Sequence, residues 1–151
     1  MDNAIINQSY SAILEVISPP AEIFLRITRD VPGWWGGKDF SGKSINLDDE
    51  FIIDHPGAHY SRQRLIEVIP DKKIVWLVAE SKLTWLKDPE EWTNTKMIFE
   101  ISSSNHSHLL YFTHEGLVPG KESYARCAAG WNRVIKDWLY TLIMYGKPHF
   151  E

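Results

Sequence analysis

The chain has 151 residues, of which 44% are hydrophobic and 13% are aromatic, including seven tryptophans. This length fits a single domain spanning residues 1–151, and the composition excludes a disordered chain because it can bury a substantial core. The net charge of −4 and the absence of a basic cluster in the sequence exclude the counterion-replacing surfaces of nucleic-acid-binding proteins.

The compartment can be inferred from the cysteine count and the N-terminal residues. The single cysteine, Cys127, leaves no intramolecular disulfide to form. The first residues, MDNAIINQSYS, have neither the basic segment nor the apolar core of a secretory signal, so we expect a cytoplasmic protein. The longest apolar run, residues 74–79, is far shorter than the roughly 20 residues that span a bilayer, which predicts no membrane span.

The N-terminal part predicts one strand followed by two short helices. Residues 10–17 alternate partly between apolar and polar side chains, as a half-buried strand does. Pro19 and Pro20 mark a helix start, where a missing N–H costs least, and Pro32 with Gly33 ends that helix. The WWGG segment at residues 34–37 is then expected to form a second short helix or a turn.

The middle of the chain predicts an antiparallel meander. The expected strands are residues 50–54, 60–69, 73–80, 95–102 and 107–115, separated by turn-forming segments. Side chains two residues apart in a strand share a face, and two such sets are expected to point into the core. These sets are Met97, Phe99 and Ile101 in one strand and Leu110, Phe112 and His114 in the next.

The C-terminal part predicts a long amphipathic helix over residues 121–145. At about 100° per residue its apolar face is formed by Tyr124, Cys127, Ala128, Trp131, Val134, Ile135, Trp138, Leu142 and Tyr145. The opposite face carries Arg126, Arg133, Lys136, Asp137 and Tyr140. Gly146 suits the position after the helix and Pro148 forbids continuation, so the helix should end near Tyr145. A curved sheet with so few helices should grip this helix in its concavity, which gives an α+β sandwich.

Seven segments stand in a consistent order along the chain: SPPAEIFLRI, VPGWWGG, HYSRQRLIEVIPDKKIVWLV, EWTNTKMIFEI, FTHEGLVP, SYARCAAGW and LIMYGKP. Together they resemble the activator of Hsp90 ATPase homologue-like family of the START and Bet v 1-like superfamily. The resemblance implies a helix-grip fold, in which a curved antiparallel sheet wraps around a long C-terminal helix and two short helices follow the first strand. It also implies a cavity between sheet and helix, which holds lipids, sterols, polyketides or plant hormones across the superfamily.

The inward-facing side chains of helix and sheet are the candidate ligand-binding residues: Trp76, Met97, Phe99, Phe112, His114, Cys127, Trp131, Val134 and Trp138. An open cavity with such walls favours a flat apolar or aromatic ligand, whereas the alternative is that the tryptophans fill it as core. Trp34 and Trp35 are expected at the cavity mouth as a lid, because the two glycines after them permit movement. The alternative is that one ring caps the core and the other covers surface.

Three functions are open at this point. The first is binding of a hydrophobic or aromatic small molecule or lipid between sheet and helix. The second, implied by the resemblance alone, is regulation of an Hsp90-type chaperone ATPase, and an exposed aromatic lid would also suit a homodimer. The third is a cyclase-like or hydrolase-like enzyme that uses His114, whose titration range suits proton transfer. The alternative for His114 is a core histidine bonded to the backbone or to a strand partner.

Other reactive side chains predict no cofactor and no metal site. The pair His55 and His59 straddles Pro56-Gly57, and neither this pair nor His106 with His108 has an acidic or cysteine partner at a ligand spacing. Cys127 lies one turn before Trp131 on the apolar face, so its thiol is expected to be buried and unreactive. The sequence has no phosphate-binding loop, nucleophile elbow or dinucleotide fingerprint.

Overall fold

The computed structural model describes residues 8–103 and 106–150. Its elements in chain order are β1 (Tyr10–Val16), α2 (Pro20–Thr28), α3 (Val31–Trp34), the 3-10 turn η1 (Gly37–Asp39), β2 (Phe40–Gly42), β3 (Glu50–His55), β4 (His59–Ile69), β5 (Lys73–Leu83), β6 (Lys96–Ser103), β7 (His108–Glu115), α4 (Tyr124–Arg133), η2 (Val134–Leu139) and α5 (Tyr140–Tyr145). The expected strands are confirmed, and two short helices follow β1 as expected. The helix boundaries differ, because α2 already ends at Thr28 and Pro32 and Gly33 lie inside α3. β2 is a three-residue edge strand that the sequence did not predict.

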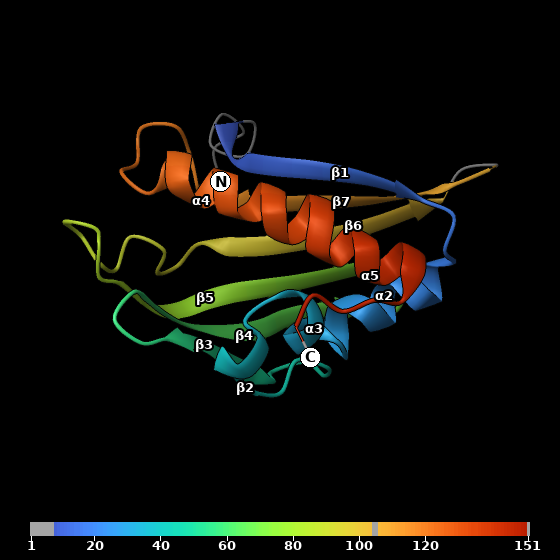
Figure 1. The fold of residues 1–151 in the computed structure, drawn as a ribbon, viewed down its shortest axis with the longest axis horizontal. Coiled ribbons are helices and arrows are strands. Elements are labelled where there is room, and N and C mark those ends of the chain that lie inside the picture. The colour runs from blue at the N-terminus through green and yellow to red at the C-terminus, as the bar shows by residue number, and fades with distance from the viewer. Residues whose placement is uncertain (1–7, 104–105, 151) are drawn as a thin grey trace.

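The sheet is a seven-stranded antiparallel meander closed at one edge by the first strand. Its order is β1-β7-β6-β5-β4-β3-β2. The first strand, β1, therefore lies at one edge of the sheet and pairs antiparallel with the last strand, β7. Register shifts occur between β4 and β5 on both sides of residues 63–65, and such irregularities bend and twist a sheet. Figure 1 shows α4 and α5 running across one face of this sheet, with α2 and α3 beside α5.

The core lies between the sheet and the C-terminal helix. Met97, Phe99, Leu110, Phe112 and His114 are buried there, as the strand parity predicted, because alternate side chains of β6 and β7 face the helix. Further along the same face, Trp76 of β5 contacts the rings of Phe51, Trp34 and Phe99. The inner face of the sheet therefore carries a cluster of aromatic rings.

The C-terminal helix is continuous from residue 124 to residue 145, but its middle segment η2 is π-helical. A π-helix bonds i to i+5 and so holds more residues per turn than an α-helix. The buried positions after Ile135 are therefore Leu139, Leu142 and Ile143, whereas Trp138 is only partly buried and Tyr145 is 67% exposed. The helical phase predicted from the sequence is therefore wrong for Trp138 and Tyr145, whereas Leu142 is buried as predicted.

The helix ends as predicted. Gly146 adopts a left-handed conformation with φ of 68°, and its N–H donates to the Leu142 carbonyl over 2.9 Å. The last residues then fold back, and the His149 N–H donates to the Gly33 carbonyl over 2.8 Å. Within residues 8–103 and 106–150, no helix has both the length and the apolar character needed to cross a membrane.

Candidate functional site

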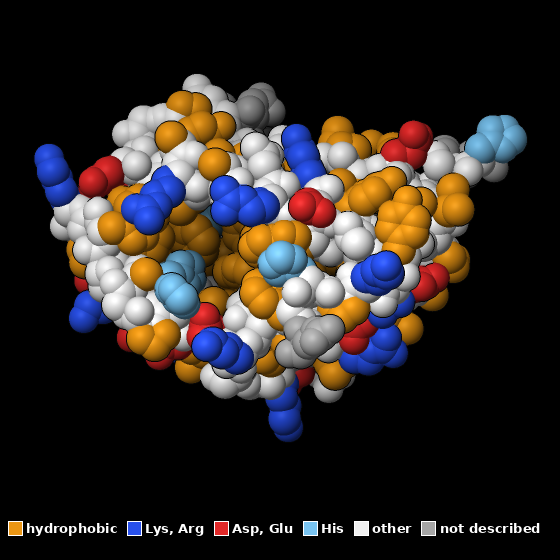
Figure 2. Space-filling model, in the orientation of Figure 1, with side chains coloured by type: hydrophobic (Ala, Val, Ile, Leu, Met, Phe, Trp, Pro, Cys, Tyr) orange, Lys and Arg blue, Asp and Glu red, His pale blue; other side chains and the backbone are white. Residues whose placement is uncertain are grey.

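A cleft of about 180 Å³ opens at one end of the helix–sheet interface. Its lining residues are Trp35, His59, Leu83, Trp85, Trp92, Arg126, Cys127, Gly130, Trp131 and Val134. The helix forms one side, and the connector between β5 and β6 forms the other. Figure 2 shows this hollow with a hydrophobic floor, Lys or Arg side chains at its upper edge and His side chains at its lower edge. A cavity of about 150 Å³ holds benzene, so the cleft can admit a ring.

Four of the ten residues that line the cleft are tryptophans. The rings of Trp92 and Trp131 are stacked, with centroids 6.1 Å apart and planes 10° apart. Trp35 lies against Trp131 at 5.1 Å, and the Arg126 guanidinium lies over the ring of Trp85 at 4.5 Å. The sequence placed Arg126 on the helix face away from the core, and the structure has it exposed, at the rim of the cleft.

The cleft is open because the helix presents small side chains to it. A Cβ added at Gly130 would meet no heavy atom within 4 Å. Cys127, one turn earlier, is the other small residue on this side. Space that a Leu or Phe would fill at these positions is left to solvent or to a ligand.

A buried hydrogen-bond network holds the two stacked tryptophans. Trp131 Nε1 donates to His114 Nδ1 over 2.9 Å, so the proton of the neutral ring lies on Nε2. Thr95 Oγ1 donates its only hydrogen to the Trp92 carbonyl over 2.6 Å and therefore accepts from His114 Nε2 at 2.8 Å. One histidine thus connects the helix wall of the cleft to the connector wall.

His114 lies behind the wall and does not line the cleft. Its side chain is fully buried, and both ring nitrogens are engaged in the network. Burial, with a smaller effect of the Lys121 charge, lowers the pKa of His114 to about 3, so the ring is neutral near pH 7. The structure thus gives His114 the role of a bonded core histidine, not of a group exposed to a bound molecule.

Two other titratable side chains line the cleft. Burial, with a smaller effect of His55, lowers the pKa of His59 to about 4, and its Nε2 lies 2.7 Å from Ser61 Oγ. Burial raises the pKa of the Cys127 thiol to about 11, an effect that the Trp92 indole N–H partly opposes. Both side chains are therefore uncharged near neutral pH.

The structure brings only some of the predicted ligand-binding residues to the cleft. Cys127, Trp131 and Val134 line it. Four other residues that were expected to bind a ligand do not line the cleft, and that expectation has to be corrected. They are fully buried among other side chains at the sheet–helix interface: Trp76, Met97, Phe99 and Phe112.

Trp138 also lies away from the cleft. The π-helical turn rotates it out of the core, and it stacks on His149 with ring centroids 3.9 Å apart. Phe150 packs against the same indole at 5.4 Å. Trp138 therefore anchors the C-terminal residues, and its assignment as a ligand-binding residue has to be corrected.

The two adjacent tryptophans expected to form a lid have different positions. Trp34 is fully buried, stacks on Trp76 and donates its indole N–H to the Arg26 carbonyl over 2.9 Å, so it caps the core. Trp35 is 9% exposed and lies between Trp76 and Trp131, where it forms one wall of the cleft. The lid interpretation is therefore wrong for Trp34.

Sequence reasoning missed several residues that line the cleft: His59, Leu83, Trp85, Trp92, Arg126 and Gly130. A signal was present for two of them. Trp85 and Trp92 lie in an otherwise polar connector, and large rings in such a segment need an apolar partner. Their partner is the helix.

No protein-family model and no curated protein matches the chain. Solved structures do match it. The Aha1 dimer from Colwellia psychrerythraea has a TM-score of 0.74 and 20% identity over 92% of this chain and 98% of that one. The chain has the helix-grip fold.

Two further structures share this fold. DynU16, from the dynemicin biosynthetic locus, has a TM-score of 0.69 and 17% identity over 95% of this chain, which spans 50% of the DynU16 chain. CalU16 from Micromonospora echinospora has a TM-score of 0.62 and 10% identity over 89% of this chain and 74% of that one. Identities this low show a common fold, and the expected α+β class is confirmed.

Proposed function

We propose that this protein binds a small aromatic or apolar molecule in the cleft between α4 and the connector that joins β5 to β6. The observation that carries the proposal is the cleft itself, a hollow of about 180 Å³ walled by Trp35, Trp85, Trp92 and Trp131. Concave, mostly apolar sites with a few polar groups are the usual form of small-molecule sites in proteins. The size of the cleft favours a ligand of one or two rings.

The hydrogen-bond network supports binding because it fixes the walls before a ligand arrives. His114 holds the Trp131 indole through a hydrogen bond, and Thr95 links His114 to the Trp92 carbonyl. Ordering side chains on binding costs about 0.5–1.5 kcal/mol for each flexible one, and walls that are already ordered avoid that cost. A planar ring can then pack against the indoles by offset stacking or edge contact.

Catalysis in the cleft has less support. A general acid or base works best when its pKa lies near the working pH. His59, with a pKa of about 4, and Cys127, with a pKa of about 11, both lie well away from neutrality. His114 lies behind the wall, so the cyclase-like or hydrolase-like function has no titratable group in a favourable position among the residues that line the cleft.

Binding to a chaperone ATPase or to a second copy is the other alternative. Its support is the shared fold with the Colwellia protein, whose structure is that of a dimer. At 20% identity this likeness does not extend to partners. The small-molecule proposal instead rests on a feature of this chain's own side chains.

The test is an NMR titration of protein labelled with ¹⁵N in its tryptophan indoles, against a library of one-ring and two-ring compounds. A bound compound should shift the Trp92 and Trp131 indole signals and leave that of Trp138 unchanged. Gly130→Leu should abolish these shifts, because the new side chain would occupy the cleft. Ala129→Leu, at the neighbouring exposed helix position, is the matched control and should retain them.

Two results would contradict the proposal. One is a well-folded protein whose cleft indoles respond to no compound. The other is a set of shifts that persists in Gly130→Leu, which would place the compound elsewhere. Signal dispersion of each variant without ligand shows whether it has kept the fold.

A further inference from the structure

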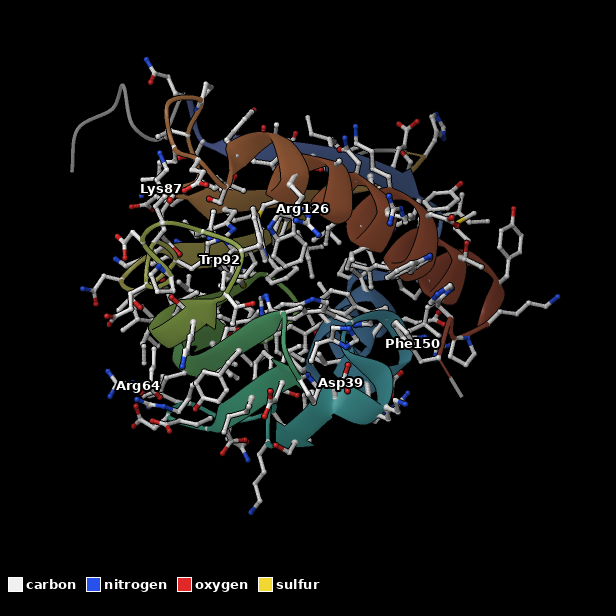
Figure 3. All side chains as sticks on the ribbon, turned by 60° about the vertical axis from the view of Figure 1, so that its left-hand side comes forward. Asp39, Arg64, Lys87, Trp92, Arg126 and Phe150 are labelled. Atoms are coloured by element: carbon white, nitrogen blue, oxygen red, sulfur yellow. The ribbon has the colours of Figure 1, made fainter. Side chains whose placement is uncertain are left out.

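The rim of the cleft carries a cation whose hydrogen-bond donors are not engaged by a carboxylate. Arg126 lines the cleft, and none of the ion pairs among the described residues involves it, whereas Arg26, Arg29 and Arg62 are each paired with acidic side chains. Figure 3 shows Arg126 on α4 and Trp92 on the connector lying close to each other at this opening. This arginine is therefore available to a ligand.

A cation–π contact holds the guanidinium of Arg126 at the rim of the cleft. Its central carbon lies over the Trp85 ring, 4.5 Å from the ring centroid. The ring face is no substitute for a carboxylate, so the planar fork of N–H groups that matches a carboxylate remains available. The arrangement presents a pre-oriented anion binder beside apolar walls.

A second donor in the cleft is only weakly engaged. Trp92 Nε1 is buried and makes no well-formed hydrogen bond within residues 8–103 and 106–150, although its N–H lies near enough to the Cys127 thiol to lower the pKa of that thiol. A thiol is a weak acceptor and the indole can only donate, so a ligand atom that satisfies it better has to be a stronger acceptor. Both donor groups of the cleft therefore favour acceptor oxygens.

Acidic side chains do not neutralise the cleft. None of its ten lining residues is Asp or Glu. Glu91 lies near enough to influence the Cys127 thiol, but its carboxylate accepts hydrogen bonds from both the backbone N–H and the hydroxyl of Ser123. The positive charge of Arg126 consequently favours an anionic ligand and disfavours a cationic one.

We propose that the ligand is a planar aromatic acid, with its ring between the tryptophan walls and its carboxylate on Arg126. This inference rests on the proposed function and specifies its ligand class. A neutral ring would fill the same space between the tryptophan walls, but it would leave the N–H donors of the Arg126 guanidinium without an acceptor. At this exposed rim we expect the charge-assisted hydrogen bond to raise the affinity about tenfold, which corresponds to about 1.4 kcal/mol.

The experiment compares acids with amides of the same shape. Dissociation constants of 2-naphthoate and 2-naphthamide, and of benzoate and benzamide as a one-ring pair, are measured by NMR titration at low and high salt. The wild-type protein should bind each acid about tenfold more tightly than its amide, with a smaller preference at high salt. Arg126→Gln should reduce the preference to about twofold or less, whereas Arg133→Gln, at an exposed position on the same helix, should preserve it.

The outcomes separate this inference from the proposed function. Equal binding of acid and amide, or an acid preference that survives in Arg126→Gln, overturns the assignment of an acid and leaves the cleft as an aromatic site. If none of the four compounds binds to the folded wild-type protein, both proposals fail. Arg126→Lys adds a finer comparison, because it retains the charge but loses the planar fork.

Discussion

The two halves of the helix–sheet interface are built differently, although one continuous helix covers both. Beyond Val134 the helix presents Ile135, Leu139, Leu142 and Ile143, all buried, and this half is filled. Before Val134 its two small residues, Cys127 and Gly130, leave a hollow beside Trp131. The comparison teaches that side-chain volume at a few helix positions decides whether this helix–sheet interface is filled or hollow.

The halves also differ in how far hydrogen bonds link their aromatic residues to one another. In the filled half, Trp34, Trp76 and Phe99 are joined by ring packing. In the hollow half, Trp131 and Trp92 stack on each other and are also linked by the hydrogen bonds of His114 and Thr95. A wall beside an empty space lacks packing on one side, so directional hydrogen bonds replace part of the packing that would otherwise hold it.

The largest expected difference between the halves is in stability. Trp76→Ala removes a fully buried ring from the filled half and should lower the free energy of unfolding by about 3–5 kcal/mol. Trp85→Ala removes a partly exposed ring from the cleft wall and should cost about 1 kcal/mol or less. Urea unfolding of both variants measures the contrast, and equal losses would show that the halves are packed alike.

The next effect is a pH dependence that originates in the hollow half. The pKa of His114 is about 3 in the folded protein, against an ordinary value of 6.5, so between these values the unfolded chain binds a proton that the folded chain does not. Stability should therefore be lost as the pH falls below 6.5, by up to about 1.4 kcal/mol per pH unit from this group. His59, with a pKa of about 4, adds a loss of the same sign over a narrower range.

The contribution of His114 is measured by urea unfolding from pH 7 to pH 4.5 in the wild type and in His114→Gln. The carboxylates are the same in both proteins, so the slope of the variant should be smaller by about 1.4 kcal/mol per pH unit. Identical slopes would contradict a neutral buried imidazole. Imidazole ¹⁵N shifts of the wild type provide a direct reading, because His114 should keep a bare Nδ1 and a protonated Nε2 down to pH 4.5.

The smallest effect is a gain in stability at Gly130, the helix position that leaves empty space beside it. Gly130→Ala should raise the free energy of unfolding by about 1 kcal/mol, because alanine has the higher helix propensity and its Cβ meets nothing within 4 Å. The same methyl group projects into the cleft and should weaken binding of two-ring compounds slightly. Thermal unfolding and a ligand titration measure the two changes, and a loss of stability would show that the space beside Gly130 is not free.

The fold could be predicted from the sequence because its signals are local. Alternation in the strands, the proline at the start of α2 and Gly146 after the last helix each report on a few neighbouring residues. Strand parity likewise put Phe99 and Phe112 correctly into the core. The short edge strand β2 has too few residues to show a pattern.

The cleft could be predicted only in part because it depends on contacts between distant segments. The π-helical turn changes which residues face the sheet, and the sequence has no periodicity signal for it, so Trp138 was assigned to the wrong environment. The position of Trp92 depends on how the connector folds back and on the bonds from Thr95 to His114. The inward direction of His114 was predictable from parity, whereas its partners were not.

The most direct measurement is a set of intermolecular NOEs between bound 2-naphthoate and the protein. Contacts from the naphthalene protons to the Trp92 and Trp131 indoles and to Gly130 Hα, with none to Trp76 or Trp138, are the result expected if the hollow half is the binding site. Contacts to Trp76 and Phe99 without those to Trp92 and Trp131 would contradict it, because the ligand would then lie in the half that the structure shows as filled.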